Sequence, residues 1–437
     1  MAKKKPTTLR FFKPAAQAPM PSRAQRECVV DIERLSAEGR GLGFWEGKPV
    51  FVAGALPGER VRARVHTDKR EWREAELIEV QAPAPARAAA PCELFGRCGG
   101  CQLQMLPYAA QVAHKQQVLE RLLAPFAASL QWQEPLLAEA FAYRHRARLS
   151  VGRDAAGKPL LGFKSAHSHD VVAVPACPVL DRRLQALLRQ LPAWLEALPH
   201  WQRIREIVIA VDAQDRLAMA CDAQPPLALA DRELLEGFAR EADVAYGKNL
   251  EPLHYAIPGQ HIDFLFLPKD FTQVNPAIND RLVTLCLQWL EPAPDDRIAD
   301  FFCGLGNFSL ALARRAGTVT GLESVAEMVA RAGANAARLG LDHARFQALD
   351  LFDETPALPP AINKAVLDPP RAGAKALCRQ LASVKTLERV VYVSCNPQTL
   401  ARDLAMLAEG GLLPRRAALV DMFPQTGHSE AVVLLSR

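Results

Sequence analysis

From about residue 270, short apolar runs alternate with longer amphipathic stretches, and this pattern constrains the possible fold more than any other feature of the chain. The short runs have the length and composition of buried strands, whereas the stretches between them have helical periodicity. Strands that alternate with helices form a parallel sheet, because each crossover between parallel strands needs a long connection. Parallel strands are predicted at 297–302, 318–322, 345–348, 365–367 and 389–393, and a final antiparallel pair at 416–421 and 431–435.

The overall composition is that of a globular protein with an ample core. The chain has 437 residues, of which 49% are hydrophobic and 23% are charged, so we expect two or three domains. No apolar run approaches the ~20 residues of a membrane span, and no signal peptide opens the sequence. These features predict a cytoplasmic protein without a membrane partner, and we expect a monomer.

A basic arm opens the chain. Residues 1–26 contain seven lysines and arginines and no acidic residue, although the net charge of the whole chain is only +5. Because the arm is rich in proline and alanine and has few large apolar residues, it is predicted to be disordered. It can attract a polyanion such as RNA, or it can be a solubilising tail, and both interpretations stay open.

Residues 27–81 read as a small all-β unit, in which short strand-like runs are separated by glycines. In the run 60–65, Arg60, Arg62 and Arg64 alternate with small apolar residues and therefore share one face. An arginine-lined strand on a small barrel suits an RNA backbone, whereas the alternative is an ordinary solvent-exposed face. A linker rich in proline and alanine follows at 82–91.

The region 92–268 is predicted to be an α+β domain, and its cysteines are its most informative residues. Cys92, Cys98 and Cys101 lie close together, and Cys177 follows alone. Without an export signal these thiols should stay reduced, which favours metal binding over disulfides. The spacing alone fits zinc as well as an iron–sulfur cluster.

A glycine-containing turn follows the first parallel strand, in the run 300–307 (Asp-Phe-Phe-Cys-Gly-Leu-Gly-Asn). Glycines let a ligand approach the backbone there, but the third glycine of the dinucleotide fingerprint is missing, which favours a nucleoside without pyrophosphate. Glu323 ends the second strand, where a carboxylate can accept both ribose hydroxyls, and Asp350 can reach an adenine amino group after the third. A different nucleotide remains the alternative.

Two further motifs follow the fourth and fifth strands. The run Asp368-Pro369-Pro370-Arg371 has arginine where adenine-N6 methyltransferases place an aromatic residue, which argues against that chemistry. Cys395 lies between a strand and a helix that begins near Pro397. Because a helix N-terminus lowers the pKa of a thiol, Cys395 is predicted to be a nucleophile; the alternative is a buried structural cysteine.

Five ordered motifs resemble those of the RNA uracil-5-methyltransferases, and they lie at 271–275, 300–307, 368–371, 394–397 and 428–430. The resemblance implies a Rossmann-like class I methyltransferase domain over 270–437 that uses S-adenosylmethionine. The residues that it assigns to the cofactor site are Gln273, Phe302, Asn307, Glu323, Asp350 and Asp368. It also implies that Cys395 is the nucleophile and that Glu430 is the base.

The N-terminal half shows two related resemblances. Residues 27–81 resemble a TRAM domain, which is an OB-like barrel that binds RNA. Cys92, Cys98, Cys101 and Cys177 resemble the [4Fe–4S] site of the bacterial 23S rRNA enzymes of this family. The expected substrate is therefore a uridine in 23S rRNA. A tRNA uridine and a non-catalytic RNA-binding or assembly role are the alternatives.

The implied reaction explains why a thiolate and a base are both needed. Carbon 5 of uracil is a poor nucleophile, but addition of a thiolate at carbon 6 creates an enolate that makes carbon 5 reactive. After methyl transfer, a base such as Glu430 must remove the proton from carbon 5 so that the thiolate can leave.

Overall fold

The computed structural model describes residues 26–166 and 168–437, so that all of the basic arm except Arg26 lies outside the described residues. The described chain forms two compact units, each treated by itself below. One consists of 26–34 with Gly41–Ala84, and the other of Leu35–Arg40 with Pro85–Arg437. No helix in the described ranges is long and apolar enough to span a membrane.

The first unit is a closed five-stranded barrel with the strand order β1-β2-β3-β5-β4. Small and β-branched side chains such as Val30, Val50, Val61 and Ala63 fill its interior, which is the packing that the period-two pattern predicts. The predicted OB-like barrel is therefore confirmed. Its strands are β1 (Glu27–Leu35), β2 (Gly41–Trp45), β3 (Lys48–Val52), β4 (Arg60–Asp68) and β5 (Arg73–Ala82).

The three arginines of β4 share the outer face of the barrel, as predicted, but acidic side chains surround them. Arg62 lies 3.0 Å from Glu27 and 3.2 Å from Glu79. Arg64 lies 3.5 Å from Glu27, and Arg60 lies 3.5 Å from Asp31. Because these carboxylates offset the positive charge, the arrangement favours the interpretation of an ordinary solvent-exposed face for this strand.

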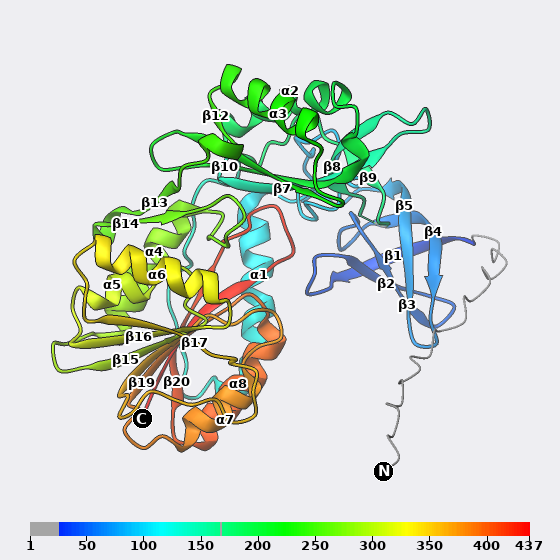
Figure 1. Cartoon of the computed structure of the whole chain (residues 1–437). Helices are drawn as coiled ribbons and strands as arrows, with labels where there is room; N and C mark the ends of the chain where they lie inside the picture. Colours follow the sequence, from blue (N-terminus) through cyan, green and yellow to red (C-terminus); the bar gives the residue numbers. More distant parts are fainter. Residues whose placement is uncertain (1–25, 167) are drawn as a thin grey trace, which may run out of the picture. The chain divides into compact units, whose positions relative to one another are not determined.

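In the second unit, an antiparallel sheet with the order β12-β11-β10-β7-β8-β9 lies beneath two helices (Figure 1). Only β12 is parallel to its neighbour β11. Leucines at positions 184, 187, 188 and 191 bury the apolar face of α2 in this core. The elements are β7 (Arg146–Arg153), β8 (Pro159–Lys164), β9 (Val171–Ala173), α2 (Arg182–Glu196), β10 (Ile204–Val211), β11 (Leu217–Ala223), α3 (Leu229–Glu241) and β12 (Val244–Ala245).

The same unit contains an eight-stranded sheet with the order β17-β16-β15-β18-β19-β21-β20-β6. The five strands from β17 to β19 are parallel, and β21 is antiparallel to both β19 and β20. The predicted α/β sheet with its final antiparallel pair is therefore confirmed. The strands are β6 (Gln131–Trp132), β15 (Arg297–Phe301), β16 (Thr318–Glu323), β17 (Ala344–Ala348), β18 (Lys364–Leu367), β19 (Arg389–Ser394), β20 (Leu413–Val420) and β21 (Glu430–Ser436).

Helices pack on both faces of this sheet, as its near-continuous apolar strands require (Figure 1). One core contains α4 (Pro276–Leu290), α5 (Ser309–Ala313) and α6 (Ala326–Arg338), together with the hairpin of β13 (Leu253–Ile257) and β14 (Ile262–Phe266). The other contains α1 (Tyr108–Leu122), α7 (Lys375–Ser383) and α8 (Pro397–Glu409). The carboxyl ends of the parallel strands, where open α/β sheets bind ligands, therefore share one edge.

A buried ion pair joins α1 to the loop between β20 and β21. Lys115 Nζ lies 2.6 Å from Asp421 Oδ1, and both side chains are almost fully shielded from solvent. Lys115 also donates a hydrogen bond to the Phe423 carbonyl at 2.9 Å. Burial lowers the pKa of Lys115, and Asp421 partly offsets this effect.

We expect Lys115→Ala to lower the free energy of unfolding by about 3–5 kcal/mol, because it leaves the Asp421 carboxylate buried without its cation. Urea denaturation would measure the change. The exposed Lys385→Ala is the control and should change the free energy by less than about 0.5 kcal/mol. Equal effects of the two substitutions would contradict the role given to the pair.

Candidate active site

Cys395 lies at the carboxyl edge of the sheet, directly after β19 and two residues before the start of α8. The Asn396 side chain caps this helix by accepting a hydrogen bond from the Gln398 N–H at 3.2 Å. The same side chain donates to the Arg371 carbonyl at 2.8 Å, which joins the turn after β19 to the turn after β18. The predicted position between a strand and a helix is confirmed.

The predicted lowering of the Cys395 pKa is wrong. Burial, together with the neighbouring carboxylates of Glu430 and Asp368, raises the pKa of the Cys395 thiol to about 11, although Arg371 and a backbone hydrogen bond oppose the shift. Cys395 precedes the helix cap, and the Asn396 side chain already satisfies a free helix N–H. Desolvation and nearby negative charge therefore outweigh the helix.

Glu430 is the first residue of β21 and is 3% exposed. Because Ser394 pairs with Ala431 in the antiparallel register, the next position of this register places Glu430 opposite Cys395. Its Oε2 has no hydrogen-bond partner among the described residues. Burial raises the pKa of Glu430 to about 8, with a further contribution from Asp368, so this carboxyl exchanges protons near neutral pH.

A cavity of about 210 Å³ opens beside Cys395 and is lined from several elements. The Arg371 Nη2 lies 3.0 Å from His428 Nε2 in its wall. Burial lowers the pKa of His428 to about 4, and Arg371 adds to this effect. The other lining residues are Ala37, Glu38, Val118, Leu122, Asn396, Pro397, Gln398, Gly427 and Ser429.

Two more carboxyls, of which Asp300 is fully buried and Asp368 is half-buried, continue the site along the sheet edge. Asp368 follows β18, and it accepts a hydrogen bond from Gln273 Nε2 at 3.3 Å. Asp300 lies on β15, and its Oδ1 has no partner in the described chain. Burial raises the pKa of both Asp300 and Asp368 to about 7. The electrostatic coupling of Glu430 to Asp368, and of Asp368 to Asp300, makes these acids one group.

The glycine turn after β15 adopts the conformation that its sequence predicts. Gly304 and Gly306 have φ of +56° and +92°, which a side chain would strain. Glu323 Oε2 accepts the Gly304 N–H at 3.3 Å, so the turn and the end of β16 are held together. Glu323 Oε1 accepts the N–H groups of Ser324 and Val325, which orients its carboxylate at the start of α6.

Asn307 is fixed by a side chain that the sequence did not single out. Asn307 Nδ2 donates to Asn279 Oδ1 at 2.9 Å, and Asn279 Nδ2 donates back to Asn307 Oδ1 at 2.8 Å. Asn279 lies on α4, one helical turn after the capping residue Asn275. The reciprocal amide pair therefore ties the glycine turn to α4.

Two aromatic rings lie beside the turn. The rings of Phe302 and Phe352 are 5.7 Å apart, and Phe352 is 53% exposed although it is large and apolar. Asp350 is exposed, and its Oδ1 accepts the Phe352 N–H at 2.9 Å. Asp350 thus contacts the rest of the site through Phe352. Such an exposed aromatic surface is available to stack on a planar ligand.

The four candidate metal ligands surround a separate cavity of about 180 Å³. Burial raises the pKa of Cys101 to about 12 and that of Cys177 to about 11. All four thiols line this cavity, and Cys177 interacts electrostatically with Cys98 and Cys92. In the described parts of the chain, no three His, Cys, Asp or Glu side chains converge on a single metal ion.

Comparison with known proteins identifies the family. Residues 237–353 and 344–437 match the model described as tRNA (Uracil-5-)-methyltransferase, and residues 23–78 match the TRAM domain. A protein of Pseudomonas fluorescens (strain Pf0-1), described as 23S rRNA (uracil(1939)-C(5))-methyltransferase RlmD, is 40% identical over 93% of this chain and 91% of its own length. A Pseudomonas putida protein of the same description is 38% identical over 99% of both chains. The chain belongs to the RNA uracil-5-methyltransferase family.

A solved structure shows the same fold. It is the Pyrococcus abyssi tRNA (uracil-54, C5)-methyltransferase in complex with S-adenosyl-L-homocysteine, with a TM-score of 0.74. The two chains are 22% identical, and the match covers 93% of this chain and 99% of the other. The likeness extends over nearly the whole of both chains.

Three residues of the site, which are Asp300, Phe352 and Asn279, were not selected from the sequence. Asp300 is the first residue of the motif 300–307, and its position near the end of a predicted strand could have indicated a role in the site. Phe352 follows the third parallel strand closely, and an aromatic residue directly after the strand end was a weak signal. No local sequence pattern indicates a role for Asn279, because its partner Asn307 lies on another segment of the chain.

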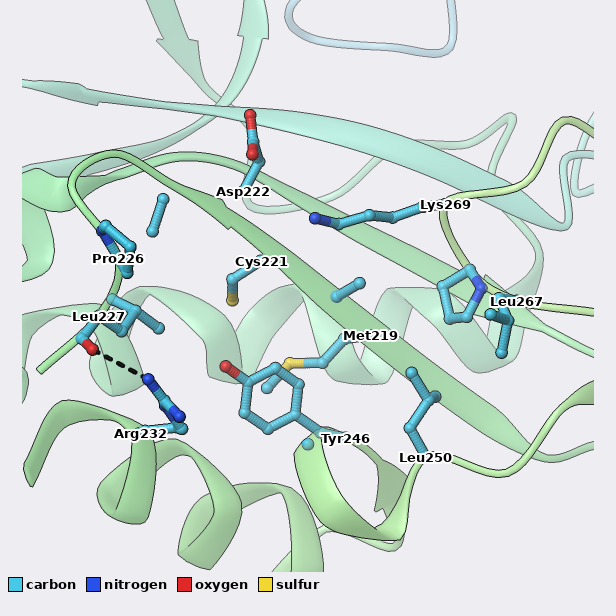
Figure 2. A pocket seen from close by; sticks show the side chains of 14 residues that line it. Met219, Cys221, Asp222, Pro226, Leu227, Arg232, Tyr246, Leu250, Leu267 and Lys269 are labelled. Carbon is cyan, nitrogen blue, oxygen red and sulfur yellow. Dashed lines mark hydrogen bonds between the residues drawn. The ribbon is translucent and has the colours of Figure 1, made fainter. Parts of the chain in front are cut away.

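A further cavity, of about 430 Å³, lies beside β11 and contains none of the candidate residues (Figure 2). Figure 2 shows Met219, Leu250 and the Tyr246 ring around it, with Lys269 and Asp222 at its border. Arg232 is held by the Leu227 carbonyl at 3.3 Å. This cavity shares no lining residue with the cavity beside Cys395.

The raised Cys395 pKa predicts how this thiol reacts with iodoacetamide. Its alkylation rate should rise about tenfold per pH unit between pH 7 and 9, without the levelling that an ordinary thiol shows near ~8.5. Glu430→Gln removes the charge that Glu430 carries above about pH 8, so it should raise the rate there and have little effect near pH 7. Mass spectrometry of the Cys395 peptide measures both effects. The exposed Glu409→Gln is the control, and a plateau below pH 8 would contradict the prediction.

Proposed function

We propose that this chain uses S-adenosylmethionine to methylate carbon 5 of a uridine in 23S rRNA, the activity in the name of its 38–40% identical relatives. The observation that carries the proposal is the pair formed by the Cys395 thiol, directly after β19, and the buried Glu430 carboxyl at the start of the neighbouring β21. A nucleophile and a base with a pKa of about 8, side by side, are the two groups that this chemistry requires.

In the proposed reaction, the Cys395 sulfur forms a bond to carbon 6 of the uracil, and the electron pair of the ring moves toward carbon 5 and the neighbouring carbonyl oxygen. Carbon 5 then takes the methyl group, whose bond to the sulfonium sulfur of the donor breaks, so that S-adenosylhomocysteine would be the leaving group. Glu430 accepts the proton from carbon 5, and the S–C6 bond breaks to return the thiolate. Each bond made to the enzyme is broken again, so the nucleophile is regenerated.

The residues around the glycine turn fit the methyl donor. Glu323 is oriented toward the turn and offers carboxylate oxygens for ribose hydroxyls, and Phe302 and Phe352 offer apolar faces to an adenine. Gln273, Asn307 and Asp368 would line the remainder, and Asp350 would reach the adenine amino group. S-adenosylmethionine, when bound, supplies the electrophilic methyl group.

Substitution of the two catalytic residues should interrupt the reaction at different steps. Cys395→Ala should abolish methyl transfer and the covalent adduct with 5-fluorouridine RNA, because no other group attacks carbon 6. Glu430→Gln should still transfer the methyl group but slow release by about 10²–10⁴-fold, so that methylated RNA stays attached. Wild-type release should increase with pH through about 8, as Glu430 ionises.

Gel analysis of protein with labelled donor and unmodified 23S rRNA or tRNA measures these outcomes. Cys221→Ala and Glu409→Gln are controls outside the site and should behave as wild type. An adduct that survives Cys395→Ala would overturn the nucleophile, and normal release by Glu430→Gln would overturn the base. Methylation of tRNA alone would show that the substrate is a tRNA uridine and not a uridine in 23S rRNA. No methyl transfer to either RNA would favour a non-catalytic RNA-binding role.

We also propose that Cys92, Cys98, Cys101 and Cys177 hold a [4Fe–4S] cluster. The cavity that the four thiols line supports a shared metal site, and the resemblance to the [4Fe–4S] site of the family is the reason to propose a cluster rather than zinc. Four iron atoms with their sulfides need more widely spaced ligands than a single tetrahedral ion does. Leu94, Phe163 and Val174 also line the cavity and would shield the cluster from water.

Anaerobically purified protein should contain about four iron atoms and four sulfides per chain. Cys98→Ser and Cys177→Ser should each lower the iron content strongly, since each removes one ligand, whereas Cys221→Ser should not. Zinc without iron in the wild-type protein would overturn the cluster.

We also propose a division of the chain into domains and an RNA-binding role for its N-terminal part. The domains would be the basic arm at 1–26, the TRAM barrel at 27–81, the cysteine-containing domain at 92–268 and the methyltransferase domain at 270–437. The arm and the barrel would bind RNA, and the protein would act as a cytoplasmic monomer.

A further inference from the structure

The base Glu430 is positioned mainly through its backbone. Its Oε2 has no hydrogen-bond partner in the described chain, so no side chain fixes that oxygen. The backbone that reaches Glu430 is the loop 421–429, which connects β20 to β21. Whatever holds this loop therefore holds the carboxyl.

Gln425, in the middle of the loop, is held by bonds from two distant segments. It is 2% exposed, and its φ of +69° is unfavourable for a residue with a Cβ. Its carbonyl accepts the N–H groups of Gln102 and Leu103, both at 3.0 Å. Its own N–H donates to Gln111 Oε1 at 3.0 Å, and its Oε1 accepts from Gln111 Nε2 at 2.9 Å.

Gln102 makes a second link, two residues further along the loop. Its Oε1 accepts the Gly427 N–H at 3.3 Å, while its Nε2 donates to the Gly99 carbonyl at 2.8 Å. Gly99 lies between Cys98 and Cys101, so one side chain joins the cysteine segment to the loop that ends at Glu430. Gly427 packs closely against the backbone of another segment, because a Cβ there would overlap the Glu38 carbonyl.

We propose that Gln102, Gln111 and Gln425, the glutamine latch, are positioning residues for Glu430 in the reaction proposed above, on which this inference rests. The latch keeps the loop in a backbone conformation that it would not adopt by itself. Loss of a latch bond lets Gln425 relax toward an ordinary φ. This shift displaces Glu430, which lies three residues after Gly427 in the chain. Proton removal from carbon 5 then slows, whereas attack by Cys395, which lies between β19 and α8 and outside the loop, does not.

The test uses the full-length protein, 23S rRNA with hydrogen or deuterium at carbon 5 of uridine, and single-turnover kinetics. Gln102→Ala and Gln111→Ala should keep methyl transfer within about twofold of wild type and slow release about tenfold, part of what a general base contributes. Methylated RNA should therefore stay attached to the protein. Deuterium should slow release in the variants more than in the wild type, because proton removal has become the slow step.

Three controls separate the latch from a loss of folding. The exposed Gln117→Ala lies on the same helix as Gln111 and should behave as wild type. Gln102→Glu keeps an oxygen that can accept the Gly427 N–H, so it should restore most of the release rate. Iron content and the melting temperature of each variant show whether the cysteine segment and the fold are intact.

The outcomes are distinct. If the wild type transfers no methyl group to RNA, the proposed function fails. If the wild type is active and both alanine variants release product at its rate, the latch fails. The latch also fails if the variants lose methyl transfer and release to the same extent, or if the isotope effect stays unchanged.

Discussion

The burial of the Glu430 carboxyl beside the Cys395 thiol is the constraint on which the rest of the site depends. An unpaired carboxylate in a protein interior is unfavourable, and its pKa rises to limit that cost. Asp300 and Asp368 respond in the same way along the same edge. Burial of Glu430 and Asp300 without a cation for each is unfavourable for folding, and it persists where the surrounding structure is held firmly.

The sheet supplies that firmness through its strand order. Five parallel strands bring the turns after β15, β16, β18 and β19 to one edge, and these turns carry the residues proposed to bind the cofactor and to attack the uracil. The antiparallel β21 enters next to β19, so that its first residue lies opposite Cys395. A shift of one residue in this register would turn Glu430 away from the site.

How much of this could be predicted depends on whether the cause is local. Strand ends and glycine turns follow from short patterns, so Asp368, Glu323 and Cys395 could be placed from the sequence. The Cys395 pKa could not, because it depends on carboxyls that approach from β18 and β21 and on the burial that they share. Gln111 and Gln425 are likewise 314 positions apart, and an isolated glutamine has no pattern that indicates a partner.

The opposition between the two catalytic groups suits the order of the proposed steps. Coulomb repulsion is symmetric, so a Cys395 thiolate opposes ionisation of Glu430 as much as Glu430 opposes the thiolate. A protonated Glu430 therefore favours the thiolate needed for attack. Once the sulfur is bonded to carbon 6, its negative charge has moved into the uracil ring. Transfer of the methyl group from the positively charged donor then neutralises the ring. Glu430 can then lose its proton more easily, at the stage when a base is required.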